Sequence, residues 1–162
     1  MVSIDDLRKI KVLDDLTQPM LESMRPLTQL NLFGEGHVVY RKGEPADFFY
    51  MLLKGKTMLE MEGSEGLMIS LGAVKPGYSF GWSSLFPHSE FGTYARCIEP
   101  CEMMSIPGNS FLKLLESDHT IGYTFMNSVA RILQRRLDRR TWQLIQVMSN
   151  HPDLQKLMAA SK

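Results

Sequence analysis

The stretch GYSFGWSSLF, at positions 77–86, combines glycines, serines and aromatic side chains with no charged residue. A glycine-flanked turn that opens into serines allows backbone N–H groups to converge on an anion. We therefore predict a ligand-binding turn between two strands. Its candidate residues are Phe80, Gly81, Trp82, Ser83, Ser84 and Leu85.

An anion held by such a turn needs a cationic partner, and arginines occur in two later segments. Arginine suits phosphate because its planar guanidinium offers a fork of donors. The candidate phosphate partners are Arg96, Arg135, Arg136 and Arg139. The last three belong to the run RILQRRLDRR, which could instead contact nucleic acid or form a solvated helix face whose arginine stems cover apolar neighbours.

Other chemistry-bearing residues give no further site. The four histidines stand far apart, and the spacing of Cys97 and Cys101 fits no common zinc pattern, so no metal site is predicted. We interpret the two cysteines as reduced structural thiols, with redox sensing as the alternative. No nucleophile elbow, P-loop or zincin helix is present, and the chain is not expected to be an enzyme.

The elements that position these residues fall into four segments. Residues 1–26 have helical spacing of apolar positions, and residues 27–106 contain short apolar or alternating runs separated by turn signals. That rhythm predicts a compact antiparallel barrel or sandwich. Residues 107–149 return to a helical period, and residues 150–162 form a C-terminal tail.

Two helices are predicted after the strands. The first begins in PGNSFLKLLESD with Asn109 or Ser110 as its N-cap, and the second covers residues 120–148. A seam that steps by three and four residues runs along the long helix, and all of its members except Arg140 are apolar: Ala130, Leu133, Leu137, Arg140, Leu144 and Val147. Such a seam is typical of a helix that packs against a partner helix, so we predict a homodimer through it. The alternative is that the seam packs on the chain's own barrel.

Composition limits the class of protein. The 162 residues carry 18 basic and 18 acidic side chains, so no global charge favours nucleic acid or an anionic membrane. No signal peptide or membrane-spanning apolar run is visible, and we expect a cytoplasmic protein that does not contact the membrane.

The order of these segments, together with the glycine-bounded turns, resembles the cyclic nucleotide-binding domain of the catabolite-activator type across residues 8–148. The matching early positions are Gly36, Gly43, Glu44, Pro45, Ala46, Asp47 and Gly55. This resemblance implies a mainly β fold: a double-stranded β-helix, or jelly-roll-like β-roll, with N-terminal helices and a long C-terminal helix. The family's transcription factors carry a helix-turn-helix after that helix, and we expect no DNA-binding domain in the remaining SNHPDLQKLMAASK.

The family's phosphate cassette places a glutamate after Phe-Gly to hold the ribose and a later arginine to neutralise the phosphate. Here Phe80 and Gly81 match, but Trp82 takes the glutamate position and Phe91 the arginine position, followed by Gly92 and Thr93. Losing both charged contacts predicts cyclic nucleotide binding weakened by roughly 10²- to 10⁴-fold.

Several interpretations of this altered cassette remain open. Another arginine could replace the missing one, or Trp82 and Phe91 could stack on a flat aromatic ligand with Ser83, Ser84 and Thr93 as hydrogen-bonding partners. Alternatively, both rings fill the vacated pocket as core residues. The resemblance also allows a haem-binding or redox variant using His88 and Cys97.

The resulting expectation is a stand-alone regulatory sensor domain that signals through its C-terminal helix. Its candidate ligands are cyclic AMP, cyclic GMP or another small anionic or aromatic molecule. The alternative is a protein-interaction domain that dimerises and has kept only the fold.

Overall fold

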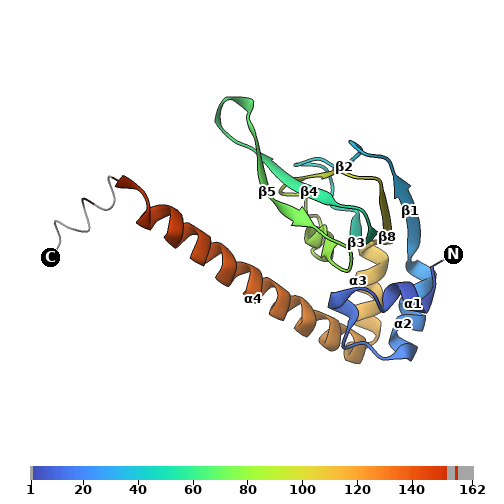
Figure 1. Cartoon of the computed structure of the whole chain (residues 1–162). Helices are drawn as coiled ribbons and strands as arrows, with labels where there is room; N and C mark the ends of the chain where they lie inside the picture. Colours follow the sequence, from blue (N-terminus) through green and yellow to red (C-terminus); the bar gives the residue numbers. More distant parts are fainter. Residues whose placement is uncertain (1, 153–155, 157–162) are drawn as a thin grey trace. The chain divides into compact units, whose positions relative to one another are not determined.

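The computed structural model of the chain describes residues 2–152 and 156 (Figure 1). The chain divides into two compact units, Met1–Phe125 and Met126–Lys162, which are described separately below. The first contains the strands and the shorter helices. The second consists mainly of the later part of the long C-terminal helix.

The described residues of the first unit form eight strands, arranged in two four-stranded antiparallel sheets (Figure 1). One sheet has the order β1-β8-β3-β6 and the other the order β2-β7-β4-β5. This arrangement confirms the predicted β-roll. The strands are β1 (Gln29–Phe33), β2 (Val38–Tyr40), β3 (Phe48–Lys54), β4 (Thr57–Glu62), β5 (Met68–Val74), β6 (Ser79–Phe80), β7 (Tyr94–Cys97) and β8 (Cys101–Pro107).

The interior of the roll is built from side chains that alternate along each strand, because successive residues of a strand point to opposite faces. In β3, Tyr50 and Leu52 point into the roll, while Phe49 contacts the helices on the other face. The buried interior cluster, called the roll core below, comprises Tyr40, Tyr50, Leu52, Val74, Phe80, Phe91, Ala95, Cys97, Cys101 and Met103.

The N-terminal segment is helical, as predicted, but in short pieces. They are α1 (Ile4–Leu7), α2 (Gln18–Met24) and the 3-10 helices η1 (Lys11–Leu13) and η2 (Arg25–Leu27). A capping box joins Ser3 and Asp6 at the start of α1. Hydrogen bonds from Lys9 and Ser3 lower the pKa of Asp6 to about 2.

The helix α3 (Gly108–Ser117) begins two to three residues earlier than the sequence predicted, with Pro107 at the N-cap position in place of Asn109 or Ser110. The reason is a close approach of backbone segments. The Gly108 N–H donates to the Asp47 carbonyl at 2.8 Å, and a Cβ added at Gly108 would lie 2.3 Å from the carbonyl oxygen of Ser84. Only glycine fits there, so the chain turns directly from β8 into the helix.

The long helix α4 (His119–Ser149) agrees with the predicted 120–148 helix to within one residue at each end. The carboxylate of Asp118 accepts from the N–H groups of Thr120 and Ile121 at 2.9 and 3.1 Å and so caps its start. No helix among the described residues is both long and apolar enough to cross a membrane. Most of the predicted tail, residues 150–162, lies outside the described residues.

Candidate functional site

The predicted ligand-binding turn leads from β6 through Gly81 into the 3-10 helix η4 (Trp82–Leu85). Gly81 has a φ of 75°, which favours glycine, and a Cβ there would lie 3.0 Å from the Phe48 carbonyl oxygen. The two-residue strand β6 was not predicted, because it is too short to show an alternating pattern. It pairs with β3 and fixes Phe80 opposite Tyr50.

The two serines of this turn differ in their burial and in the hydrogen bonds that they make within the turn. The Ser84 hydroxyl donates to the Gly81 carbonyl oxygen at 2.8 Å, and the Ser84 N–H reaches the same oxygen at 3.1 Å. Ser84 is buried, whereas Ser83 is half-buried and its carbonyl accepts from the Phe86 N–H. The turn therefore uses the hydroxyl of Ser84 to stabilise itself. Leu85 is buried with it.

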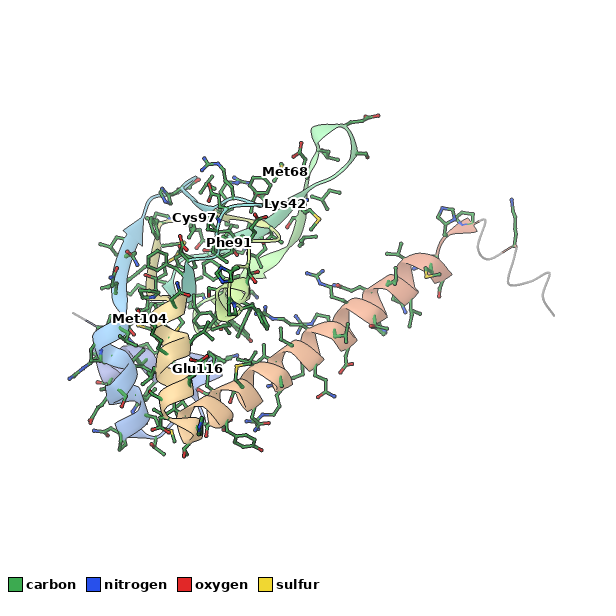
Figure 2. The ribbon with its side chains drawn as sticks, turned by 180° about the vertical axis from the view of Figure 1, so that it is seen from behind. Lys42, Met68, Phe91, Cys97, Met104 and Glu116 are labelled. Carbon is green, nitrogen blue, oxygen red and sulfur yellow. The ribbon has the colours of Figure 1, made fainter. Side chains whose placement is uncertain are left out.

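Phe91, which we predict from the sequence to take the position of the family's arginine, lies in the roll core with 5% of its surface exposed (Figure 2). Its ring is nearly parallel to that of Tyr40, at 9°, and the two centroids are 3.7 Å apart. Tyr40 in turn contacts Phe80 and Tyr50, at centroid distances of 6.0 and 5.9 Å. Burial and the charges of Asp47 and Glu44 raise the pKa of Tyr50 to about 12. An aromatic cluster thus occupies this part of the roll.

The backbone on either side of Phe91 is held by the turn between β2 and β3. The Gly43 N–H donates to the Phe91 carbonyl, and the Phe91 N–H donates to the Glu44 carbonyl, both at 2.9 Å. The Ala46 N–H donates to the Ser89 carbonyl at the same distance. These bonds are the structural role of the GEPA turn, whose glycine has a φ of 83°. They position the Phe91 side chain in the core.

Trp82, which we predict from the sequence to take the position of the family's glutamate, belongs to a different aromatic cluster. Its ring meets Phe49 edge-on, with centroids 5.1 Å apart. Phe49 lies 6.0 Å from both Phe111 of α3 and Phe125, and these two rings are 4.8 Å apart. Because Phe49 and Tyr50 point to opposite faces of β3, Trp82 and Phe91 contact opposite faces of that strand. This placement does not favour stacking of both rings on a single ligand.

Arg96, a candidate phosphate partner, is paired with a glutamate on the outer face of the roll. Its guanidinium contacts both carboxylate oxygens of Glu60, at 2.5 and 3.0 Å. This hydrogen bonding raises the pKa of Arg96. The neighbouring Ala95 and Cys97 point into the roll core, so Arg96 points away from it. Sequence reasoning missed Glu60, although its place opposite Tyr94 follows from strand pairing.

The remaining candidates lie in two places. Gly92 and Thr93 lead into β7, and a Cβ at Gly92 would meet nothing within 4 Å. Arg135, Arg136 and Arg139 lie on α4 in the second unit, so their contact with phosphate stays a prediction.

The two residues of the haem interpretation differ in environment. His88 is exposed in the cassette loop with a φ of 57°, whereas Cys97 is fully buried in the roll core. Burial raises the pKa of the Cys97 thiol to about 12. Among residues 2–152 and 156, no three His, Cys, Asp or Glu side chains gather as a metal site would require.

Comparison with known proteins identifies the fold family. Residues 30–118 match the sequence profile of the cyclic nucleotide-binding domain, which covers more than half of the chain. This chain belongs to the cyclic nucleotide-binding domain family. No curated protein sequence matches it at a significant level.

Solved structures of this family superpose on the chain. A protein from Geobacter metallireducens GS-15, described as a candidate cyclic nucleotide-binding protein, is 27% identical with a TM-score of 0.74, over 85% of this chain and 99% of that one. The sensor domain of the transcriptional regulator DNR from Pseudomonas aeruginosa is 20% identical with a TM-score of 0.68, over 83% and 90%.

The regulatory domain of Toxoplasma gondii PKA, crystallised with cAMP, is 19% identical with a TM-score of 0.67, over 84% of this chain and 48% of that one. At this level of identity, it and the DNR domain support the fold alone. Family and fold together indicate a regulatory binding domain.

Proposed function

We propose that this chain is a regulatory domain of the cyclic nucleotide-binding family that binds no cyclic nucleotide at its cassette and acts through self-association of α4. The observation that carries the proposal is the burial of Phe91 against Tyr40 at the position of the family's arginine. In this proposal the domain has the fold of a sensor domain, but the aromatic side chains of Phe91 and Tyr40 fill the space that a ligand would occupy.

A cyclic nucleotide in the family's arrangement would place its phosphate beside an apolar ring where the family has a guanidinium. An anion removed from water without a paired cation is strongly disfavoured, typically by several kcal/mol. Entry of the phosphate would also separate Phe91 from Tyr40, which loses the burial of a large ring, about 1.5–3 kcal/mol. Both effects oppose binding.

Self-association is supported by the apolar seam of α4. Its members Leu133, Leu137, Leu144 and Val147 have 42%, 67%, 59% and 68% of their surface exposed. Four large apolar side chains in one row on a helix surface are typical of a helix that has a partner. A second copy presents the same seam, so an isologous dimer buries both.

A second candidate function is a changed ligand, and the left-handed turn at Gly81 favours it. The glycine and the following 3-10 turn keep the backbone shape that holds anions elsewhere in the family, although the anchoring charges are replaced. A thermal-shift screen with small aromatic and anionic metabolites tests this candidate. A visible absorption spectrum of the purified protein tests the haem variant through its Soret band.

Sedimentation velocity of the full chain, with and without cyclic AMP or cyclic GMP at millimolar concentration, tests the proposal. We expect a dimer whose sedimentation coefficient and concentration dependence do not change with either nucleotide. A monomer at micromolar protein concentration contradicts the self-association. A dimer that forms or dissociates on addition of a cyclic nucleotide contradicts the closed cassette.

A further inference from the structure

The long helix α4 carries a net positive charge, although the chain as a whole is neutral. It contains five arginines and one aspartate and no lysine, a net charge of +4, whereas the whole chain is neutral. The rest of the chain is therefore net negative by the same amount. A charge asymmetry of this kind indicates an anionic partner, and the exclusive use of arginine points to phosphate.

Three of these arginines form one row along the helix. Arg131, Arg135 and Arg139 are exposed and follow each other at intervals of four residues. Four residues advance a helix by about 6 Å and rotate it by roughly 40°, so the three guanidinium groups lie on one face. Leu133, Leu137 and Leu144 lie on the opposite face. A partner helix on the leucine seam would leave the arginine row open.

An aromatic side chain lies within this row. Trp142 follows Arg135 by seven residues and Arg139 by three, which places it at roughly the same angle around the helix. Its side chain is 62% exposed. Trp142 therefore stands away from the leucine seam, among the arginines, where a large apolar ring costs solubility unless it has a partner. We call Arg131, Arg135, Arg139 and Trp142 the arginine–tryptophan face.

We propose that the arginine–tryptophan face binds single-stranded nucleic acid. Guanidinium groups at regular spacing along a helix suit a continuous phosphate backbone, whose release of counterions drives binding. The exposed indole provides a surface on which an unpaired base stacks, a contact that tolerates any sequence. A duplex keeps its bases stacked inside, so this face is expected to prefer single strands.

A membrane is the competing anionic surface, and the arrangement of the helix disfavours it. A helix that lies on a bilayer inserts its apolar face between lipids, with Trp on that side, and carries its basic residues on the opposite, polar face. Here Trp142 lies among the arginines, so a bilayer that takes up the leucine seam leaves this exposed indole in water. The proposal concerns a different face from the dimer seam and does not depend on the dimer.

Fluorescence anisotropy of the full chain with a labelled single-stranded oligonucleotide of about 20 nucleotides tests the proposal, at several salt concentrations. We expect binding that weakens as the salt concentration rises. A double variant with Arg135→Gln and Arg139→Gln should reduce the slope of log binding constant against log salt concentration by about 1.4. Trp142→Ala should weaken binding by roughly 5- to 100-fold. The matched control, Arg8→Gln with Arg25→Gln, removes two exposed arginines from the N-terminal helices and should bind as the wild type.

Four results would overturn the proposal. They are no binding at low salt, binding unchanged by the two α4 substitutions, a loss of binding in the control equal to that in the α4 variant, and binding to a duplex of the same length at least as tight as to the single strand. Vesicles of phosphatidylserine and phosphatidylcholine provide a further arm. Vesicle binding that the α4 substitutions abolish, without binding to the oligonucleotide, assigns the face to membranes and contradicts the proposal.

Discussion

The ring of Phe91 lies nearly parallel to the ring of Tyr40, with centroids 3.7 Å apart, and we predict from the sequence that Phe91 takes the position of the arginine in the cyclic nucleotide-binding family. We propose that an aromatic pair inside the roll takes the place of a charged ligand contact. The GEPA turn, residues 43–46, holds the backbone around Phe91 through hydrogen bonds to Phe91 and Ser89.

Phe91→Ala should lower the free energy of unfolding by about 3–5 kcal/mol, because it removes a buried ring and leaves a cavity beside Tyr40. Urea denaturation at a fixed protein concentration measures this loss. Phe86→Ala is the matched control in the same loop, since Phe86 is 58% exposed, and should change stability by less than about 0.5 kcal/mol. Equal effects at the two positions would contradict the packing role of Phe91.

Gly108→Ala should destabilise the protein by about 1–3 kcal/mol, because the added methyl group would lie 2.3 Å from the Ser84 carbonyl oxygen and force η4 away from α3. Gly92→Ala provides the comparison, since nothing lies within 4 Å of its added Cβ. That variant should be unchanged or more stable by up to about 1 kcal/mol. Thermal unfolding of both variants measures the difference, and a Gly108→Ala protein as stable as wild type would show that the two segments are not tightly packed.

Leu137→Arg should dissociate the proposed dimer. Each dimer contains two copies of this side chain, and the loss of about 1.5–3 kcal/mol per leucine raises the dissociation constant by roughly 10²- to 10⁴-fold. Gln146→Arg adds the same charge to an exposed position away from the seam and should leave the dimer intact. Sedimentation equilibrium of the two variants measures both constants. If both variants dissociate equally, added charge and not the seam explains the effect.

The Cys97 thiol should make the fold sensitive to alkaline pH. Its folded pKa is raised to about 12 from an ordinary value of 9.0, so its contribution to stability is complete below pH 9.0 and is lost as the pH rises toward 12. Tyr50, also raised to about 12, contributes in the upper part of the same range. Urea midpoints measured across this range should fall less steeply in Cys97→Ala than in wild type. Identical slopes would mean that Cys97 does not titrate as a buried group.

The reactivity of the cysteines offers a separate measurement. Both Cys97 and Cys101 are buried and free, so a thiol reagent at pH 8 should label neither in the native protein and both in urea. Rapid labelling of the native protein would favour the redox-sensing interpretation over the structural one.

The fold was predictable because turn glycines and alternating strands are local signals. Seven of the strands coincide with apolar or alternating runs, and the long helix agrees in length and position with its heptad-like pattern. Strand β6 was not predicted because two residues are too few to show an alternating pattern. The N-cap of α3 was predicted wrongly because the cause, the contact between Gly108 and Ser84, joins residues far apart in the chain.

The glycine turn that leads into Trp82–Leu85 was predicted from the sequence, but the directions of its side chains were not. That Trp82 and Phe91 replace charged residues of the family stays a prediction. Whether both rings face one pocket depends on which face of β3 each contacts, and that follows from tertiary packing against Phe49 and Tyr40. The ion pair of Arg96 with Glu60 was not predicted from the sequence either, because Glu60 becomes a neighbour of Arg96 only through the pairing of β4 with β7.

The most direct test of the closed cassette is isothermal titration calorimetry of the full chain with cyclic AMP and with cyclic GMP. We expect no saturable heat for either nucleotide up to millimolar concentration, because we propose that Phe91 and Tyr40 occupy the place of the phosphate contact. Saturable binding of either nucleotide with a micromolar dissociation constant would contradict it.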